Sequence, residues 1–135
     1  MRLTPWLIAA VLVALGGAPA SAQSASQACQ AAKTVAPATA TDTQVVPALS
    51  GTNIFICGVE ASSNGTNNFY LESSTNTTCT GTLTQVGTEW YTNANWGKIA
   101  SPYIPGLSAG LGNTLCVHTT AAVALSLTVW YAQYP

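Results

Sequence analysis

Alternation of apolar and polar positions is clearest near the C-terminal end of the chain. Every second position from 123 to 131 is a large apolar residue, namely Val123, Leu125, Leu127, Val129 and Tyr131. The positions between them hold smaller or more polar residues, apart from Trp130. A period of two residues is typical of a strand with one buried face. We therefore predict a strand here, within a closing segment that runs from Ala121 to Tyr134.

Shorter patterns of the same kind predict further strands. Residues 54–59 form a nearly continuous apolar run, and residues 68–72 alternate, with Phe69 and Leu71 on one face and Tyr70 on the other. Weaker patterns predict strands around 35 and at 43–46, 82–86, 89–91 and 113–119. Beyond residue 34 the chain shows no convincing helical periodicity, and β-branched residues and turn formers dominate. The fold class predicted is all-β.

Turn residues suggest how these strands connect. The Asn64-Gly65 pair after 54–59 is a strong hairpin signal, and the short Ala121-Ala122 connection predicts a hairpin between 113–119 and the closing strand. An alternative is donation of that closing strand to a neighbouring molecule by strand addition. The spacing of strands and polar turns predicts an antiparallel β-sandwich with two disulfides, for which a jelly roll is one arrangement.

The first residues have the pattern of an export signal. Arg2 precedes an apolar run at 6–15, and Ala20-Ser21-Ala22 offers the small residues that a signal peptidase reads before Gln23. A lipoprotein signal attached at Cys29 is the weaker alternative, because the residues before Cys29 match such a signal poorly. We expect a signal peptide at 1–22 and a secreted or periplasmic protein, with no membrane segment after cleavage.

The remaining chain is short and carries few charges. Removing residues 1–22 from the 135 leaves 113, which suits an N-terminal arm at 23–34 and a single β-sandwich domain at 35–135. Its net charge is about −2, from Lys33, Lys98, Asp42, Glu60, Glu72 and Glu89. Binding to nucleic acid needs clustered lysine and arginine. The sequence therefore excludes a nucleic-acid partner.

Four cysteines remain after the predicted cleavage, at 29, 57, 79 and 116. An even number of cysteines in a small exported domain indicates a disulfide framework. Three pairings are open, of which we favour Cys29 with Cys57 and Cys79 with Cys116. A metal site is not predicted, because the chain has no Cys-x-x-Cys pair and only one histidine.

Several segments together resemble a known group of proteins. They are the early Cys29, the strand at 54–58, the loop at 79–82, the strand at 113–117 and the ending at 129–134, which contains Tyr-Ala-Gln. This arrangement looks like a group of short exported proteins with four cysteines, bacterial and phage-associated, most of them uncharacterised. The resemblance implies a bacterial source and a small disulfide-bonded β domain, and it implies no active site.

The residues that could support catalysis are few. His118 is the only histidine and lies in a predicted strand without a Gly-x-Ser-x-Gly nucleophile elbow. A glycosidase needs two carboxylates across one sugar bond, and nothing in the spacing of the four acidic residues demands such a pair. We therefore expect a non-enzymatic protein with no catalytic residues and no cofactor.

Aromatic residues in the loop-rich region are the best candidates for ligand binding. Flat rings there could stack on sugars or anchor a protein partner, with asparagines as hydrogen-bonding neighbours; the candidates are Trp90, Tyr91, Asn93, Asn95, Trp96 and Tyr103. The competing interpretation is that the rings fill the core. The expected function is a structural or interaction module of the bacterial envelope, cell surface or a phage-derived particle, able to form oligomers. The alternatives are a carbohydrate-binding module and a small secreted hydrolase.

Overall fold

The computed structural model describes residues 29, 31–93, 99–101 and 106–135. Within these residues the structure contains strands and no helix. The strands are β1 (Ala31–Val35), β2 (Asp42–Val46), β3 (Asn53–Ser63), β4 (Asn67–Ser74), β5 (Leu83–Thr92), β6 (Ile99–Ser101), β7 (Ser108–Leu111), β8 (Thr114–Thr119) and β9 (Leu125–Tyr134). The predicted signal peptide lies outside the described residues, and β1 includes residues 31–34 of the segment expected to form an N-terminal arm.

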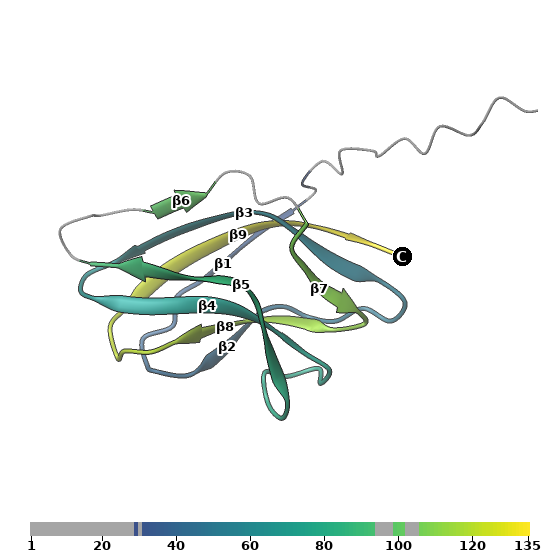
Figure 1. The fold of residues 1–135 in the computed structure, drawn as a ribbon, viewed down its shortest axis with the longest axis horizontal. Coiled ribbons are helices and arrows are strands. Elements are labelled where there is room, and N and C mark those ends of the chain that lie inside the picture. Colours follow the sequence, from purple (N-terminus) through teal and green to yellow (C-terminus); the bar gives the residue numbers. More distant parts are fainter. Residues whose placement is uncertain (1–28, 30, 94–98, 102–105) are drawn as a thin grey trace, which may run out of the picture.

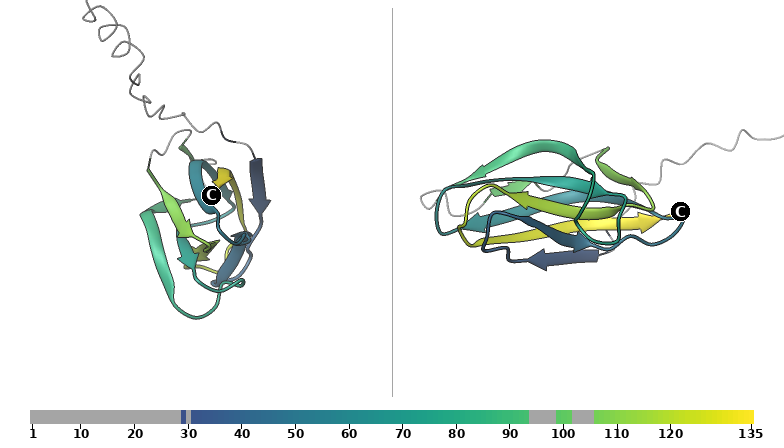
Figure 2. Two further views of the ribbon diagram at one scale, coloured as in Figure 1. Left: turned by 90° about the vertical axis from the view of Figure 1, so that its right-hand side faces the viewer. Right: turned by 90° about the horizontal axis from the view of Figure 1, so that it is seen from below.

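The strands form two antiparallel sheets that pack face to face, as the sequence predicted (Figure 1). One sheet has the order β1-β9-β3-β6, with β7 also paired to β3, and the other has the order β2-β8-β4-β5. The strands run along the long axis of the molecule, and the left view of Figure 2 looks onto the end that carries the C-terminus.

This strand order is that of a jelly roll. The chain pairs as one long hairpin, with β1 beside β9, β2 beside β8, β3 beside β6 and β7, and β4 beside β5. Rolling the hairpin up adds the pairs β3 with β9 and β4 with β8, which complete the two sheets. The arrangement confirms the all-β sandwich and specifies its topology.

The core lies between the sheets and is built from the apolar faces of the alternating strands. Phe69 and Leu71 of β4 are fully buried, while Tyr70 between them lies on the outer face, as predicted. The long strands β3 and β9 pack against β4 and β8, and their largest fully buried side chains are Ile54, Val59, Leu125, Leu127 and Val129. Burying an aliphatic side chain of this size stabilises the fold by about 1.5–3 kcal/mol.

Two predicted hairpins are wrong. The strands on either side of Asn64-Gly65, β3 and β4, belong to different sheets, and so do β8 and β9 on either side of Ala121-Ala122. Both connections are arches that carry the chain from one sheet to the other. The closing strand nevertheless pairs within its own chain, between β1 and β3. The alternation of apolar and polar residues indicates which face of a strand is buried. Two strands joined by a hairpin and two joined by an arch show the same alternation, so the pattern does not distinguish these connections.

The weak patterns predicted at 82–86 and 89–91 fall on one strand, β5, which begins at Leu83. The pairing of β5 with β4 shifts its register between Val86 and Trp90, opposite Leu71 and Phe69. Gly87 lies in this irregular stretch with φ +82°. Only glycine adopts that backbone conformation at little cost. The bulge lets the strand continue where the sequence suggested an interruption.

The two disulfides have the favoured pairing. Cys29 is bonded to Cys57 and Cys79 to Cys116, with Cα atoms 6.0 and 5.9 Å apart. The first bond ties the start of the described chain to β3. The second ties the loop at 75–82 to β8. Disulfides of this kind are typical of oxidising, non-cytosolic compartments.

Candidate functional site

The structure describes two of the four predicted aromatic residues, and it places them on opposite faces of β5. Trp90 is half-buried, packs against the core and stacks on Phe69 with ring centroids 5.6 Å apart. Tyr91, the next residue, is 46% exposed on the outer face of the same strand, and Asn93 is half-buried. The other three predicted residues, Asn95, Trp96 and Tyr103, lie outside the described residues. The side chain of Trp90 therefore lies on the core-facing side of β5, and that of Tyr91 lies on the solvent-facing side.

A group of polar residues gathers instead on the outer face of the β2-β8-β4-β5 sheet. The strand register sets Asp42 of β2 opposite His118 of β8, and His118 opposite Tyr70 of β4. Residues directly opposite each other in an antiparallel pair place their side chains on the same face. Three residues far apart in the sequence thus form one row across the sheet.

His118 is held from two sides in this row. Its Nδ1 lies 2.6 Å from Oδ1 of Asp42, and its ring stacks on that of Tyr70 at a centroid distance of 4.8 Å. The buried hydroxyl of Thr119 donates a hydrogen bond to the carbonyl of Thr39 at 2.7 Å, which fixes the segment leading into Asp42. The imidazole and the carboxylate are still about one third exposed, at 31% and 28%.

Glu72 lies in the adjacent row, under a covering loop. It is opposite Cys116 of β8, which pairs in turn with Gln44 of β2. The disulfide from Cys116 to Cys79 and a hydrogen bond from Gln44 Nε2 to the carbonyl of Thr77 hold the loop at 75–82 over this part of the sheet. Glu72 is left only 7% exposed.

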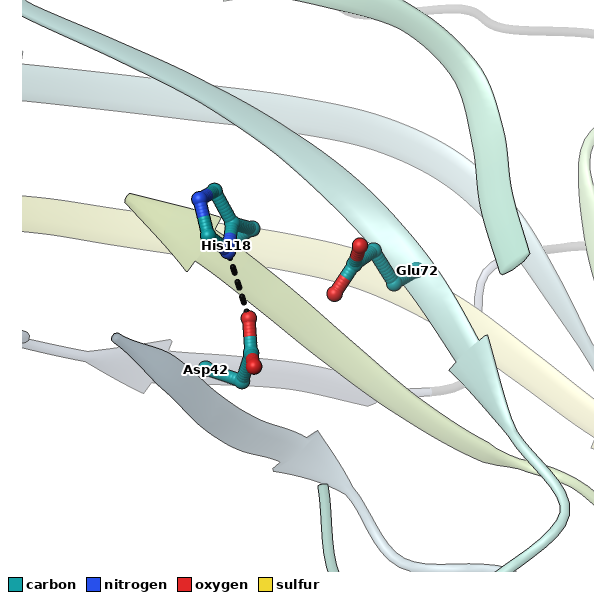
Figure 3. A group of neighbouring side chains, drawn as sticks. All are labelled: Asp42, Glu72 and His118. Atoms are coloured by element: carbon teal, nitrogen blue, oxygen red, sulfur yellow. Dashed lines mark hydrogen bonds and ion pairs between the residues drawn. The ribbon is translucent and has the colours of Figure 1, made fainter. Parts of the chain in front are cut away.

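The carboxyl group of Glu72 points out of this cover toward Asp42 and His118 (Figure 3). Candidate ligand atoms of Asp42, Glu72 and His118 all lie within 4.8 Å of one another. We call these three residues the carboxylate–histidine cluster. Oε2 of Glu72 is buried and has no hydrogen-bond partner. Buried polar atoms of folded proteins are nearly always paired, so this oxygen requires an explanation.

The environment disfavours a negative charge on Glu72. Burial raises the pKa of Glu72, and the neighbouring charge of Asp42 acts in the same direction, while that of His118 lowers it. Partial burial and the nearby carboxylates of Glu72, Asp42 and Glu89 likewise raise the pKa of Tyr70. The cluster is therefore a site of concentrated negative potential.

Sequence reasoning gave no role to this cluster. From the sequence, no catalytic role was expected for His118, no pairing was evident among the carboxylates, and no metal site was predicted. The sequence did contain one signal. Tyr70, Glu72 and His118 alternate with the core-facing residues of their strands, so their side chains lie on the outer face of the sheet. The strand register that brings them together is visible only in the structure.

The other sheet carries a different surface, near the C-terminal end of the molecule. Asn53 of β3 pairs with Leu111 on one side and Tyr134 on the other, and the ring of Tyr134 lies 6.4 Å from that of Phe55. Leu111 is 68% exposed. We call Phe55, Leu111 and Tyr134 the apolar patch.

A turn with a further exposed leucine is hydrogen-bonded to the chain beside the apolar patch. Leu49, which is 54% exposed, accepts a hydrogen bond from Thr52, whose own carbonyl accepts one from Gly112 at 2.7 Å. The turn that bears Leu49 is thereby joined to the residue after Leu111. Leu49 and Leu111 are the most exposed large hydrophobic residues in the described part of the chain.

Fold and sites together define a small disulfide-bonded jelly-roll domain with a polar cluster on one sheet and an apolar patch on the other. None of the described segments is a helix long and apolar enough to cross a membrane. Comparison with protein-family models, with curated proteins and with solved structures finds no match for this chain.

Proposed function

We propose that the protein is an exported, non-enzymatic structural or interaction module of the bacterial envelope, cell surface or a phage-derived particle. The signal pattern at 1–22 and the two disulfides support a secreted or periplasmic location. The resemblance to short exported bacterial and phage-associated proteins supports the same class. The jelly roll itself is compatible with many functions and decides none of them.

The apolar patch carries this proposal. Exposed apolar side chains that gather on one surface are typical of interaction sites. Exposed Leu111 and half-buried Phe55 and Tyr134 share the outer face of one sheet, with Asn53 between Leu111 and Tyr134. The turn at 49–52, which bears the exposed Leu49, is hydrogen-bonded to Gly112, the residue after Leu111. The occupant we propose is a second copy of this chain, because a domain with a net charge of about −2 repels its own copies only weakly.

Self-association of the mature protein tests the proposal. We expect wild-type protein to form oligomers of defined mass in native mass spectrometry and in sedimentation velocity. A Leu49→Ser/Leu111→Ser variant should be monomeric. The matched control is Tyr91→Ser, which removes an exposed aromatic residue from the other sheet and should leave the oligomers intact. A wild-type protein that stays monomeric would contradict the proposed occupant.

A glycan-binding module is the second candidate, and Tyr91 is the observation that favours it. The exposed ring of Tyr91 lies on the outer face of the sheet, beside Asn68 of the neighbouring strand β4. Asn68 precedes Tyr70 by two residues on the same strand. An exposed ring next to an amide suits a sugar face and its hydroxyls. A glycan array separates the two candidate functions. Selective sugar binding by a monomeric wild-type protein, lost in Tyr91→Ala, would favour the glycan-binding module.

A further inference from the structure

The unpaired oxygen of Glu72 indicates that the carboxylate–histidine cluster has a missing partner. The residue is 7% exposed, and its Oε2 is buried without a hydrogen bond. Figure 3 shows the carboxyl group of Glu72 directed toward Asp42 and His118. A buried carboxylate oxygen without a donor is destabilising unless a cation or another donor satisfies it.

The chemistry of the three candidate ligands selects a class of cation. One imidazole nitrogen and two carboxylate oxygens suit first-row divalent metals, of which zinc binds both kinds of atom at about 2.0–2.2 Å. Calcium takes about 6–8 oxygen ligands and is poorly matched to a histidine. The cysteines do not compete as ligands, because all four form disulfides.

The dimensions of the cluster fit such an ion. Tetrahedral zinc at these bond lengths holds its ligand atoms about 3.3 Å apart. Nδ1 of His118 and Oδ1 of Asp42 are 2.6 Å apart, and the three candidate ligand atoms lie within 4.8 Å of one another. The side chains of Asp42 and Glu72 have rotatable bonds, so we expect binding of an ion to bring the three atoms to this separation without movement of the strands.

The negative charge of the two carboxylates also favours binding of a cation. Two carboxylates face each other here, and the one lysine among the described residues, Lys33, lies on β1 of the other sheet. A divalent ion would neutralise both carboxylates at once. The exposed side of Asp42 and His118 leaves room for water to complete the coordination.

We propose that Asp42, Glu72 and His118 bind one zinc ion or a similar first-row divalent metal ion. The ion joins β2, β4 and β8, three neighbouring strands of one sheet, at the margin of the loop held by Cys79. It satisfies the unpaired oxygen of Glu72 and leaves one coordination position open to solvent. This site is independent of the apolar patch, which lies on the other sheet.

Calorimetric titration of metal-free, disulfide-bonded mature protein with Zn²⁺ tests the site. We expect one ion per chain, an increase in thermal stability on binding, and a visible Co²⁺ absorption spectrum of low-symmetry coordination. Because loss of an outer-sphere partner alone weakens metal binding about 10- to 100-fold, Glu72→Gln and His118→Gln should each weaken it at least tenfold. Glu89→Gln, the same change at an exposed glutamate, should bind as wild type does.

Two results would overturn the proposal. One is the absence of saturable binding by the wild type at millimolar Zn²⁺. The other is equal affinity in wild type and Glu72→Gln, which would leave the ion on the exposed pair of Asp42 and His118 alone. Circular dichroism establishes that each variant is folded, and Asp42→Asn provides the same comparison should His118→Gln not fold.

Discussion

Loss of the disulfide between Cys79 and Cys116 is expected to lower the free energy of unfolding by about 4 kcal/mol. The bond closes a loop between residues 37 positions apart. In the chain-entropy model a loop of that length restricts the unfolded chain by about 3.8 kcal/mol at 25 °C. The other bond, between residues 28 positions apart, gives about 3.6 kcal/mol by the same relation. The two bonds should therefore contribute nearly equally.

The perturbation needs two variants, because Cys116 is fully buried. Cys79→Ser breaks the bond and leaves the sulfur of Cys116 in place. The double variant Cys79→Ser/Cys116→Ala also removes that buried sulfur and adds the cost of a small void. The difference between the variants measures the packing of Cys116, and the loss in Cys79→Ser measures the cross-link.

Guanidinium denaturation with linear extrapolation supplies the free energies, and calorimetry supplies the melting temperatures. For a domain of this size, a loss of about 4 kcal/mol corresponds to a fall in melting temperature of about 15 °C. Cys29→Ala/Cys57→Ala is the matched comparison. A loss below about 1 kcal/mol in Cys79→Ser would refute the reasoning, because the bond would then not restrict the unfolded chain as the model requires.

The remaining predictions concern Glu72, Gly87 and Phe69. Since the pKa of Glu72 is raised in the folded protein, the folded state binds more protons, and the stability of metal-free protein should fall as the pH rises from about 4.5 through that raised value. Urea denaturation at several pH values should show this decrease in the free energy of unfolding for wild type and not for Glu72→Gln, and the variant should be the more stable protein at pH 7. Parallel pH profiles of stability for the two proteins would contradict the prediction. Gly87→Ala should cost about 1–3 kcal/mol, because alanine is strained at φ +82° and its Cβ would lie 2.8 Å from Cδ1 of Leu107. Gly51→Ala, at φ +73° with open space around it, should cost less by the same measurement, and an equal loss would exclude the contact with Leu107 as a cause. Phe69→Ala should cost about 3–5 kcal/mol in denaturant unfolding, because its ring is fully buried; a loss under 1 kcal/mol would show that the core closes over the void.

The sequence predicted the strands better than their connections, and for a physical reason. Alternation reports the burial of each face, so Phe69, Leu71 and Tyr70 were assigned correctly. A hairpin and an arch differ only in whether the second strand joins the same sheet or the facing one. In both cases the apolar residues point into the core. The Asn64-Gly65 pair is compatible with either connection, and the structure shows the arch.

The candidate site was harder to predict because its spacing is set by topology. Metal motifs with short spacings arise where one loop or helix supplies several ligands. Here each candidate ligand comes from a different strand, and Asp42 and His118 are 76 positions apart. That separation is the length of chain between the paired strands β2 and β8. It is set by the jelly-roll topology and carries no information about metal coordination. Only the register, which places Asp42 opposite His118 and Glu72 opposite the disulfide-bonded Cys116, converts three isolated polar residues into one site.

The disulfide and the cluster are coupled through that register. Cys116 lies two residues before His118, so both side chains point outward from β8, and the bond to Cys79 holds the loop at 75–82 over Glu72. Without that cover Glu72 would be hydrated, and its carboxylate would need no partner. Cys79→Ser should therefore weaken Zn²⁺ binding at the proposed site although it removes no ligand, whereas Cys29→Ala/Cys57→Ala should not. Calorimetric titration at a temperature where both variants are folded measures this difference, and equal affinities would show that burial of Glu72 contributes nothing to binding.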